Sequence, residues 1–422
     1  MSAHYESDSR ESPHIQRHIE DLTSENPRQR SFAVQELGKL RASQAVSVLV
    51  TLLQKDVNTY VRSASAEALG HIGDASAVFP LMDALHDSCS FVRRAAAISL
   101  GQLKAKEAQG ALLHALDDPN FYVRRAAINA IGKLDVPDMG QVLLPLLDAP
   151  DPRIRRTVVT ALRRLASHEA IPKMVETLDT YIITPSQRDL PVVKTLVVAF
   201  GELRAEEAVP ALIRVVRGYV GGRSLAALSL GQIGDKAAIE VLIEALNDKS
   251  VKLQLAAMKS LGQLGDPSVL PVIRKFLSAP DPRMRRMAVL TVGHLLDYAS
   301  TPLLLKIAYD DNSPLVRPAA IEALGKVGNT RLIPDLLPLV NDTNAFLRAA
   351  LVHTLIALDG NAPQVQAALE RLSHDQVEHV AFVARSAMAH RGGMPQLIQE
   401  PASPNQTEKK PASWLKRLLR RA

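Results

Sequence analysis

The chain has 422 residues, of which 47% are hydrophobic and only 4% aromatic. A single cysteine, Cys89, excludes an internal disulfide and fits a reducing, intracellular compartment. The first residues lack a basic stretch followed by an apolar one, so we expect no secretory signal. No apolar run approaches the ~20 residues that a membrane-spanning helix needs. The composition therefore predicts a soluble, cytoplasmic protein.

The formal net charge of +6 is concentrated at the C-terminal end. Residues 399–422 hold six basic and two acidic side chains, so this segment carries +4 and leaves +2 for the rest of the chain. A body so close to neutral is a weak candidate for wrapping nucleic acid.

After twelve polar residues (1–12), which we predict to be disordered, one phrase recurs along the chain. It has the form V-R-x-x-A-x-x-x-L-G-x-L, and its Arg serves as an anchor. The anchors recur every 30 to 32 residues, apart from one spacing of 38, and such a period is typical of an internal repeat. The anchor positions are Arg30, Arg62, Arg93, Arg124, Arg155, Val193, Arg223, Gln254, Arg285, Arg317 and Arg348.

Each repeat predicts two helices, A and B. Helix A often carries Pro near its start, where the missing N–H costs nothing. Helix B is apolar at positions −1, +3, +4, +7 and +10 from the anchor, which share one face of a helix. Gly stands at +8 in most repeats, where we expect close packing and a helix stop. In the third repeat the apolar positions are Val92, Ala96, Ala97, Leu100 and Leu103.

An Asp recurs six residues before the anchor. It is expected to cap helix B or to pair with the anchor Arg of its own or the next repeat, so we interpret both residue types as structural ladders. These positions are Asp56, Asp87, Asp118, Asp248, Asp311 and Asp342.

Two segments depart from the repeat. The long spacing marks an insertion at residues 179–190, where we expect Tyr181, Ile182 and Ile183 in a loop that is either a contact site or neutral variation. Beyond residue 392 we expect a flexible linker (393–412) and a short basic amphipathic helix (413–422). Its apolar face suits a membrane surface or a partner's groove, and a solubilising basic end is the alternative. That face consists of Trp414, Leu415, Leu418 and Leu419.

Motifs for chemistry are scarce. We find no Gly-rich phosphate loop, metalloprotease helix or nucleophile elbow. His14 and His18 can share a helix face, but no third ligand stands near them. We assign no catalytic residue, no metal site and no resident cofactor, and favour binding over catalysis.

The side of helix B that points away from the predicted core is basic in the third to fifth repeats and apolar further along. A groove of this kind suits an acidic protein, or a ligand with carboxylates and an apolar body. The alternative is that these side chains pack under loops or form ordinary surface pairs. The candidate partner-binding residues are Arg94, Arg125, Lys133, Arg156, Arg163, Arg164, Val198, Leu228 and Leu290.

Three aromatic residues, Tyr60, Phe91 and Tyr122, stand two positions before consecutive anchors. Stacked repeats would bring their rings side by side at one edge. We interpret them as packing between repeats, with aromatic recognition as the alternative.

The segment FVRRAAAISLGQLKAKEAQGALLHALDDPNFYVRRAAINAIGKL (91–134) resembles the phycobilisome-lyase HEAT-like family, which includes the E/F-type phycobilin lyases of cyanobacteria and NblB-like proteins. The resemblance extends over about residues 14–390. With the periodicity, it predicts an all-α fold: an α-solenoid (right-handed superhelix) of about eleven short HEAT-like helical hairpins over residues 13–392. It also implies a protein that holds a phycobiliprotein and attaches, isomerises or detaches its linear tetrapyrrole.

Three functions remain open at this point. The first is a scaffold or chaperone-like adaptor that binds a phycobiliprotein or another acidic protein through its concave face. The alternative is a phycobilin lyase or chromophore-detaching enzyme, in which Arg94, Arg125 and Arg156 hold the propionates of a transient linear tetrapyrrole. The second alternative is a nucleic-acid-binding solenoid. The C-terminal segment adds the expectation of peripheral contact with the thylakoid or inner membrane surface.

Overall fold

The computed structural model describes residues 13–218 and 221–389. These residues form 24 α-helices joined by short 3-10 segments, and no strand is found among them. The chain divides into two compact units, residues 1–295 and 296–422. The predicted disordered N-terminus (1–12), linker (393–412) and C-terminal helix (413–422), with Trp414, Leu415, Leu418 and Leu419, lie outside the described residues.

The α-helices are numbered in chain order. Their bounds are α1 Pro13–Asp21, α2 Pro27–Lys39, α3 Val46–Lys55, α4 Thr59–Ile72, α5 Val78–Ala84, α6 Ser90–Leu103, α7 Gln109–His114, α8 Phe121–Ile131, α9 Met139–Leu143, α10 Pro152–Arg164, α11 Ile171–Ile183, α12 Leu190–Leu203, α13 Val209–Arg217, α14 Arg223–Ile233, α15 Ile239–Ala245, α16 Val251–Leu264, α17 Leu270–Ile273, α18 Pro282–His294, α19 Thr301–Asp310, α20 Val316–Val327, α21 Ile333–Leu336, α22 Ala345–Asp359, α23 Pro363–Ser373 and α24 Glu378–Ala389.

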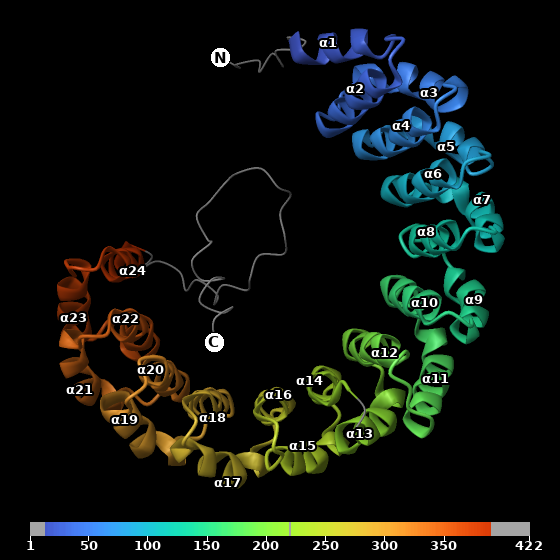
Figure 1. Ribbon diagram of the computed structural model, residues 1–422. Helices are drawn as coiled ribbons and strands as arrows, with labels where there is room; N and C mark the ends of the chain where they lie inside the picture. The colour runs from blue at the N-terminus through green and yellow to red at the C-terminus, as the bar shows by residue number, and fades with distance from the viewer. Residues whose placement is uncertain (1–12, 219–220, 390–422) are drawn as a thin grey trace. The chain divides into compact units, whose positions relative to one another are not determined.

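Odd-numbered helices are the predicted A helices and even-numbered helices the B helices, so the 24 helices make twelve hairpins. Each B helix packs on the B helix of the next repeat within its unit. In the first unit the B helices line the inner side of a curve and the A helices its outer side (Figure 1). The all-α solenoid is thus confirmed. The structure adds a twelfth hairpin to the eleven that the anchors predict, because Ala381 stands where its anchor Arg would be.

The core lies between the two layers of helices, as the apolar pattern predicts. In α6, Val92, Ala96, Ala97 and Leu100 are completely buried, whereas Leu103 at the helix end is half-buried. Small side chains on the B helices allow their close approach and so bury the larger Leu and Val side chains against helix A.

Anchor Arg side chains connect successive repeats. The Arg93 guanidinium donates from Nε and Nη2 to the Asp118 carboxylate of the next repeat, at 2.7 and 3.0 Å. Its Nη1 donates to the carbonyl oxygens of Asp87 and Ser88, which closes its own A–B turn. The predicted ladder is therefore confirmed: Arg30, Arg62, Arg93, Arg223, Arg317 and Arg348 each pair with the Asp of the repeat that follows. Equivalent bidentate pairs are Arg30–Asp56, Arg62–Asp87 and Arg348–Asp375.

The ladder Asp does not cap helix B, so that part of the expectation is wrong. Asp118 accepts the N–H of Asn120, and Asn120 in turn caps α8 by accepting the N–H of Tyr122. Burial alone would raise the pKa of the Asp118 carboxyl. The hydrogen bonds from Arg93 and from the Asn120 N–H outweigh burial and hold that pKa below its ordinary value.

A second seam joins the B helices through small residues. A Cβ added to Gly101 would stand 2.7 Å from the Cα of Ala130 in α8, so this position requires glycine. In the neighbouring pair, Ser99 of α6 donates to the carbonyl oxygen of Ala66 at 2.8 Å. Close packing at the +8 glycine is confirmed. Gly132 also ends α8, but the left-handed residue that closes each turn lies three residues later.

The stop at position +11 has a left-handed backbone in each of the first ten repeats. Glycine occupies it in four of them, and side-chain-bearing residues do so in the other six. Because non-glycine residues adopt this conformation only at a cost, sequence alone did not reveal the stop. These six are Arg41, Lys104, Asp135, Ala166, Arg204 and Leu296.

The first part of the insertion at residues 179–190 continues helix A to Ile183. Tyr181, Ile182 and Ile183 form the last turn of α11 instead of the expected loop, and Tyr181 is buried. The helix continues because these residues carry no stop signal before Thr184, and burial of the Tyr181 ring favours that extra turn. Only residues 184–189 form a connection.

Candidate functional site

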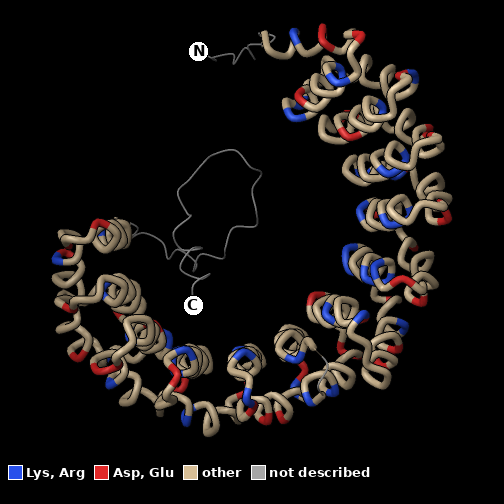
Figure 2. Tube along the Cα trace, viewed as in Figure 1, with Lys and Arg blue, Asp and Glu red and all other residues tan. Residues whose placement is uncertain are grey.

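Basic side chains gather on the inner B helices of three neighbouring repeats. The helices α6, α8 and α10 contain several Arg residues and no Asp or Glu, as the colouring of Figure 2 shows. We call their inward-facing cations, with the lysine that follows α8, the basic patch. It consists of Arg94, Arg125, Lys133, Arg156 and Arg164.

The helical stacking sets the spacing within the basic patch. Helix α6 packs on α8 and α8 packs on α10, so the +1 residues of the three repeats lie on neighbouring helices, roughly 8–10 Å apart. Arg94, Arg125 and Lys133 line one shallow depression of about 90 Å³. Ile98, Tyr122, Ala126, Asn129 and Ala130 complete its lining.

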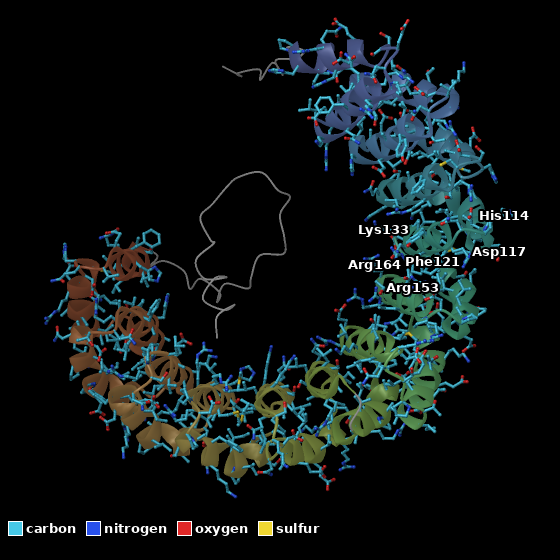
Figure 3. The ribbon with its side chains drawn as sticks, viewed as in Figure 1. His114, Asp117, Phe121, Lys133, Arg153 and Arg164 are labelled. Carbon is cyan, nitrogen blue, oxygen red and sulfur yellow. The ribbon has the colours of Figure 1, made fainter. Side chains whose placement is uncertain are left out.

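Two aromatic rings lie among the arginines at the start of α8. The Arg94 and Arg125 guanidinium carbons lie 5.9 and 5.7 Å from the Tyr122 ring centre. The Phe121 ring meets Tyr122 edge-on at 5.3 Å, and the Arg153 guanidinium carbon lies 4.2 Å from its centre. Stacking of this kind holds Arg side chains in place while their N–H groups stay available. In Figure 3, Lys133 and Arg164 lie toward the inner side and His114 and Asp117 at the outer edge.

The row of aromatics does not pack between repeats, so that interpretation is wrong. Tyr60, Phe91 and Tyr122 are 77%, 65% and 51% exposed. Each ring precedes the first buried position of its B helix by one residue, which turns it about 100° away from the core. The alternative, aromatic recognition at the surface, is the reading that this exposure favours.

The residues of the basic patch form no ion pairs with other described residues, whereas Arg163, another of the predicted binding residues, does. Within residues 13–218 and 221–389, no carboxylate lies within 4.0 Å of the charged groups of the five basic-patch residues, which are exposed or half-buried. Arg163 differs, because its Nη1 donates to both carboxylate oxygens of Glu202 in α12 at 2.7 and 2.8 Å. Arg163 thus joins two repeats at the position where other repeats have Gly, and its charge is already paired.

The apolar row is separate from the basic patch. Val198, Leu228 and Leu290 lie on α12, α14 and α18 and are half-buried, although the sequence predicts exposed side chains. Position +5 borders the neighbouring B helix, which covers part of each side chain. Lys259 of α16 interrupts the row, so these residues do not form one apolar surface.

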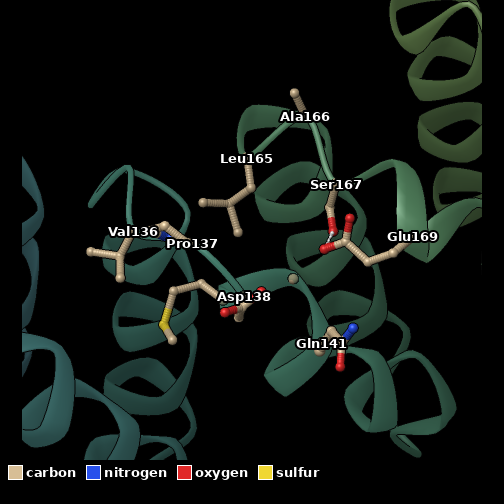
Figure 4. Close-up of a pocket in the computed structure, with 10 residues that line it drawn as sticks. Val136, Pro137, Asp138, Gln141, Leu165, Ala166, Ser167 and Glu169 are labelled. Atoms are coloured by element: carbon tan, nitrogen blue, oxygen red, sulfur yellow. Dashed lines mark hydrogen bonds between the residues drawn. The ribbon is translucent and has the colours of Figure 1, made fainter.

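A larger cavity of about 380 Å³ lies at the ends of the B helices α8 and α10 (Figure 4). Its lining includes Asp138, Gln141, Ser167 and Glu169. The Ser167 hydroxyl donates to Glu169 at 2.6 Å, and this hydrogen bond lowers the pKa of the Glu169 carboxyl. Left-handed residues at Asp138 and Ala166 shape the opening, a feature that apolar periodicity cannot reveal.

Two other features concern metal ions and membranes, in the part of the chain that the structure describes. It holds no group of three or more His, Cys, Asp or Glu side chains placed to bind a metal ion. None of its helices is long and apolar enough to span a lipid bilayer.

Solved structures with the same fold include nuclear-transport receptors. The chain is similar to Kap95p in a structure of its binding to RanGDP, with 15% identity and a TM-score of 0.65 over 90% of this chain and 62% of that one. It is similar to importin beta with 14% identity and a TM-score of 0.64 over 89% and 62%. The chain therefore spans about 62% of the length of these proteins, and the likeness shows the fold.

The complex of CpcE and CpcF of phycocyanin lyase from Nostoc sp. also matches, at 24% identity and a TM-score of 0.35, over 70% of this chain and 98% of that one. A TM-score this low carries no structural argument. No curated protein sequence matches the chain.

Models of known repeat families match defined segments of the chain. Residues 223–248 match the PBS lyase HEAT-like repeat, which confirms the predicted resemblance for that segment. The model for HEAT repeats matches in overlapping segments from 15 to 181 and again from 239 to 389. The chain belongs to the HEAT-repeat family.

Proposed function

We propose that this HEAT-repeat protein is a scaffold that holds an acidic protein partner against its basic patch. The observation that carries the proposal is the set of five cations without a carboxylate of the described residues within 4.0 Å: four lie on three helices that contain no acid, and Lys133 follows α8. Arg and Tyr together, as at Arg94, Tyr122 and Arg125, are the residue types that dominate protein interfaces.

A binding role accounts for the depression better than catalysis does. Its lining offers guanidinium, ammonium, amide and phenol groups, but no carboxylate, imidazole or thiol. Proton transfer and nucleophilic attack most often use such groups, and no hydrogen bond joins the two lining groups that could replace them, the Tyr122 phenol and the Lys133 amine. Recognition of carboxylates needs only the fixed fork of the guanidinium groups.

A protein partner also suits the charge distribution better than nucleic acid. Duplex DNA carries one charge per about 1.7 Å of axis, so binding favours a long basic surface. The basic patch ends within three repeats, because Glu67 in α4 and Glu202 in α12 stand on the B helices to either side. A phycobiliprotein is the acidic partner that the PBS lyase HEAT-like match suggests.

Charge reversal at the basic patch tests the proposal. The triple variant Arg94→Glu, Arg125→Glu, Arg156→Glu is compared with Lys55→Glu, Lys106→Glu, Arg188→Glu, which changes the charge equally at exposed positions elsewhere. We expect a fluorescent Glu-rich peptide to bind the full chain and the second variant, but not the first. Equal loss in both variants would show that total charge, and no defined surface, binds the peptide. A single-stranded oligonucleotide of equal charge is the comparison for the nucleic-acid alternative.

A second candidate, bilin attachment or removal, is favoured by the PBS lyase HEAT-like match at 223–248. In this case Arg94, Arg125 and Arg156 would hold the propionates of a transient linear tetrapyrrole beside the Tyr122 ring. Co-expression with a phycobiliprotein subunit and a bilin tests it. A coloured covalent adduct that depends on this chain supports it, and unchanged absorbance rejects it.

The scaffold would work in the cytoplasm and contact the thylakoid or inner membrane surface through residues 413–422. Co-sedimentation with anionic vesicles tests this part. The full chain should sediment, whereas a chain that ends at Glu400 should remain in solution. Equal behaviour of the two would remove the membrane contact and leave the scaffold intact.

A further inference from the structure

We call an anchor Arg together with the Asp of the next repeat a rung of the ladder. One rung lacks its acid. In the fourth repeat, Arg124 keeps the usual contacts of Nη1, to the carbonyl oxygens of Asp118 and Pro119 at 2.8 and 3.1 Å. In the fifth repeat, the ladder position that holds Asp in other repeats is occupied by Ala149. No carboxylate of the described residues lies within 4.0 Å of the Arg124 guanidinium, and Arg124 makes no other hydrogen bond there.

Elsewhere in the chain a missing rung residue is matched by a change in its partner. Ala279 also replaces the ladder Asp, but there the anchor is Gln254, whose Nε2 donates to the Asp248 carbonyl oxygen at 2.8 Å and needs no acid. Val193 replaces an anchor Arg, and Arg217 stands at the Asp position that would have faced it. Among the ladder pairs described above, Arg124 is the anchor that keeps its charge without a carboxylate within 4.0 Å.

The rung beside it is also incomplete. Arg155 donates from Nη2 to Asp189, which comes from the extended connection before α12 and not from the usual ladder position. Its Nε is buried and has no hydrogen-bond partner. Two consecutive rungs, Arg124 and Arg155, thus have guanidinium N–H groups without a protein partner, and those of Arg124 are not buried.

The incomplete rungs adjoin the basic patch. Phe121 lies one helical turn before Arg124 on α8, and the guanidinium carbons of Arg125 and Arg153 lie 5.8 and 4.2 Å from its ring centre. A partner segment that covers these residues therefore also reaches the place where the fifth repeat lacks its Asp.

We propose that Arg124 is an open rung, a site that binds an Asp or Glu carboxylate of the acidic partner in place of the missing ladder acid. This inference rests on the proposed function. In closed rungs such as Arg93–Asp118, Nε and Nη2 bind a carboxylate in bidentate geometry, and Nη1 holds the Arg124 guanidinium in the same way. A carboxylate fits that planar fork with two parallel hydrogen bonds.

A double-mutant cycle tests the open fork without any partner. Ala149→Asp restores the usual rung and should raise the urea midpoint of the full chain. Arg124→Gln copies the natural Gln254 arrangement, so it keeps the carbonyl contact and removes the fork. We expect Ala149→Asp to have no stabilising effect when Gln is at position 124. Equal effects in both backgrounds would show that the Arg124 fork is not open toward position 149.

Binding of the fluorescent Glu-rich peptide tests the ligand. Arg124→Gln and Ala149→Asp should each weaken binding about tenfold, the first by removing the fork and the second by filling it. If both bind like the parent chain while the basic-patch triple variant does not, the open rung is wrong and the scaffold proposal stands. If the parent chain itself does not bind, both proposals fail.

The eighth repeat provides a gain-of-function arm. Gln254→Arg places a new anchor Arg opposite Ala279 and so creates a second open rung. We expect a second peptide equivalent to bind to this variant, and the double variant Gln254→Arg, Ala279→Asp to lose it again. An unchanged stoichiometry for Gln254→Arg would contradict the idea that an uncompensated anchor Arg is sufficient to bind a carboxylate.

Discussion

Gly101 is the position where the packing of the array can be tested most sharply. It lies inside α6, two residues before the helix ends, and its Cα faces Ala130 of α8. The Cβ of an alanine at this position would stand 2.7 Å from the Ala130 Cα and 2.9 Å from its Cβ. Backbone and Cβ atoms cannot rotate away, so Gly101→Ala must push the two helices apart.

The expected magnitude follows from two opposing effects. Ordinary carbon contacts lie at about 3.5–4.0 Å, so the helices would have to separate by close to 1 Å. Overpacking of this kind costs about 1–3 kcal/mol. Replacing Gly by Ala inside a helix returns up to about 1 kcal/mol. We expect the free energy of unfolding to fall by up to about 2 kcal/mol.

Gly262 is the matched control, because it occupies the same place in α16. A Cβ there would meet the Thr291 side chain at 3.4 Å, an ordinary contact, so the helix-propensity gain should dominate. Urea unfolding followed by circular dichroism compares the two variants, and amide hydrogen exchange in α6 and α8 shows whether the loss is local. A Gly101→Ala variant as stable as Gly262→Ala would refute the reasoning.

Three other changes test separate parts of the fold. Asp118→Asn should make the loss of stability in acid less steep. Because the pKa of the Asp118 carboxyl is below its ordinary value, the carboxylate contributes stability above about pH 4, and this contribution is lost as the pH falls through the lowered pKa. Urea midpoints measured over a range of pH should therefore decline less in the variant than in the parent chain. Ser99→Ala removes the buried donor to the Ala66 carbonyl and should lower the free energy of unfolding by about 1 kcal/mol in urea titrations. Lys104→Gly should raise that free energy by up to about 1 kcal/mol, because Lys104 has φ 52°; an unchanged melting temperature would contradict this.

The repeat architecture could be predicted because its determinants are local and recurrent. Apolar positions such as Val92 and Leu100 follow helical periodicity, and the regular distance from Arg93 to Asp118 predicts which residues can pair across repeats. The basic residues at +1 also follow directly, since Arg94 and Arg125 stand at the same place in consecutive repeats. That they share a depression required only the stacking of α6 on α8.

What could not be predicted depends on contacts that break the repeat. The pairing of Arg163 with Glu202 joins residues that occupy non-equivalent positions in their repeats, so no spacing rule reveals it. The repeat pattern stops before Tyr181, so it gives no sign that α11 continues for another turn; the buried Tyr181 ring shows why it does. The cavity near Asp138 depends on left-handed residues without glycine, which leave no signal in composition.

The shared left-handed stop has a consequence for how such an array changes length. Because the chain leaves helix B with the same backbone direction whether position +11 is Gly73 or Lys104, one repeat can follow another regardless of which residues close it. At this junction one hairpin can therefore replace another without a change in backbone conformation. The near-identical segments APDPRIRRTVV (149–159) and APDPRMRRMAV (279–289) are what copying of such a hairpin would leave behind.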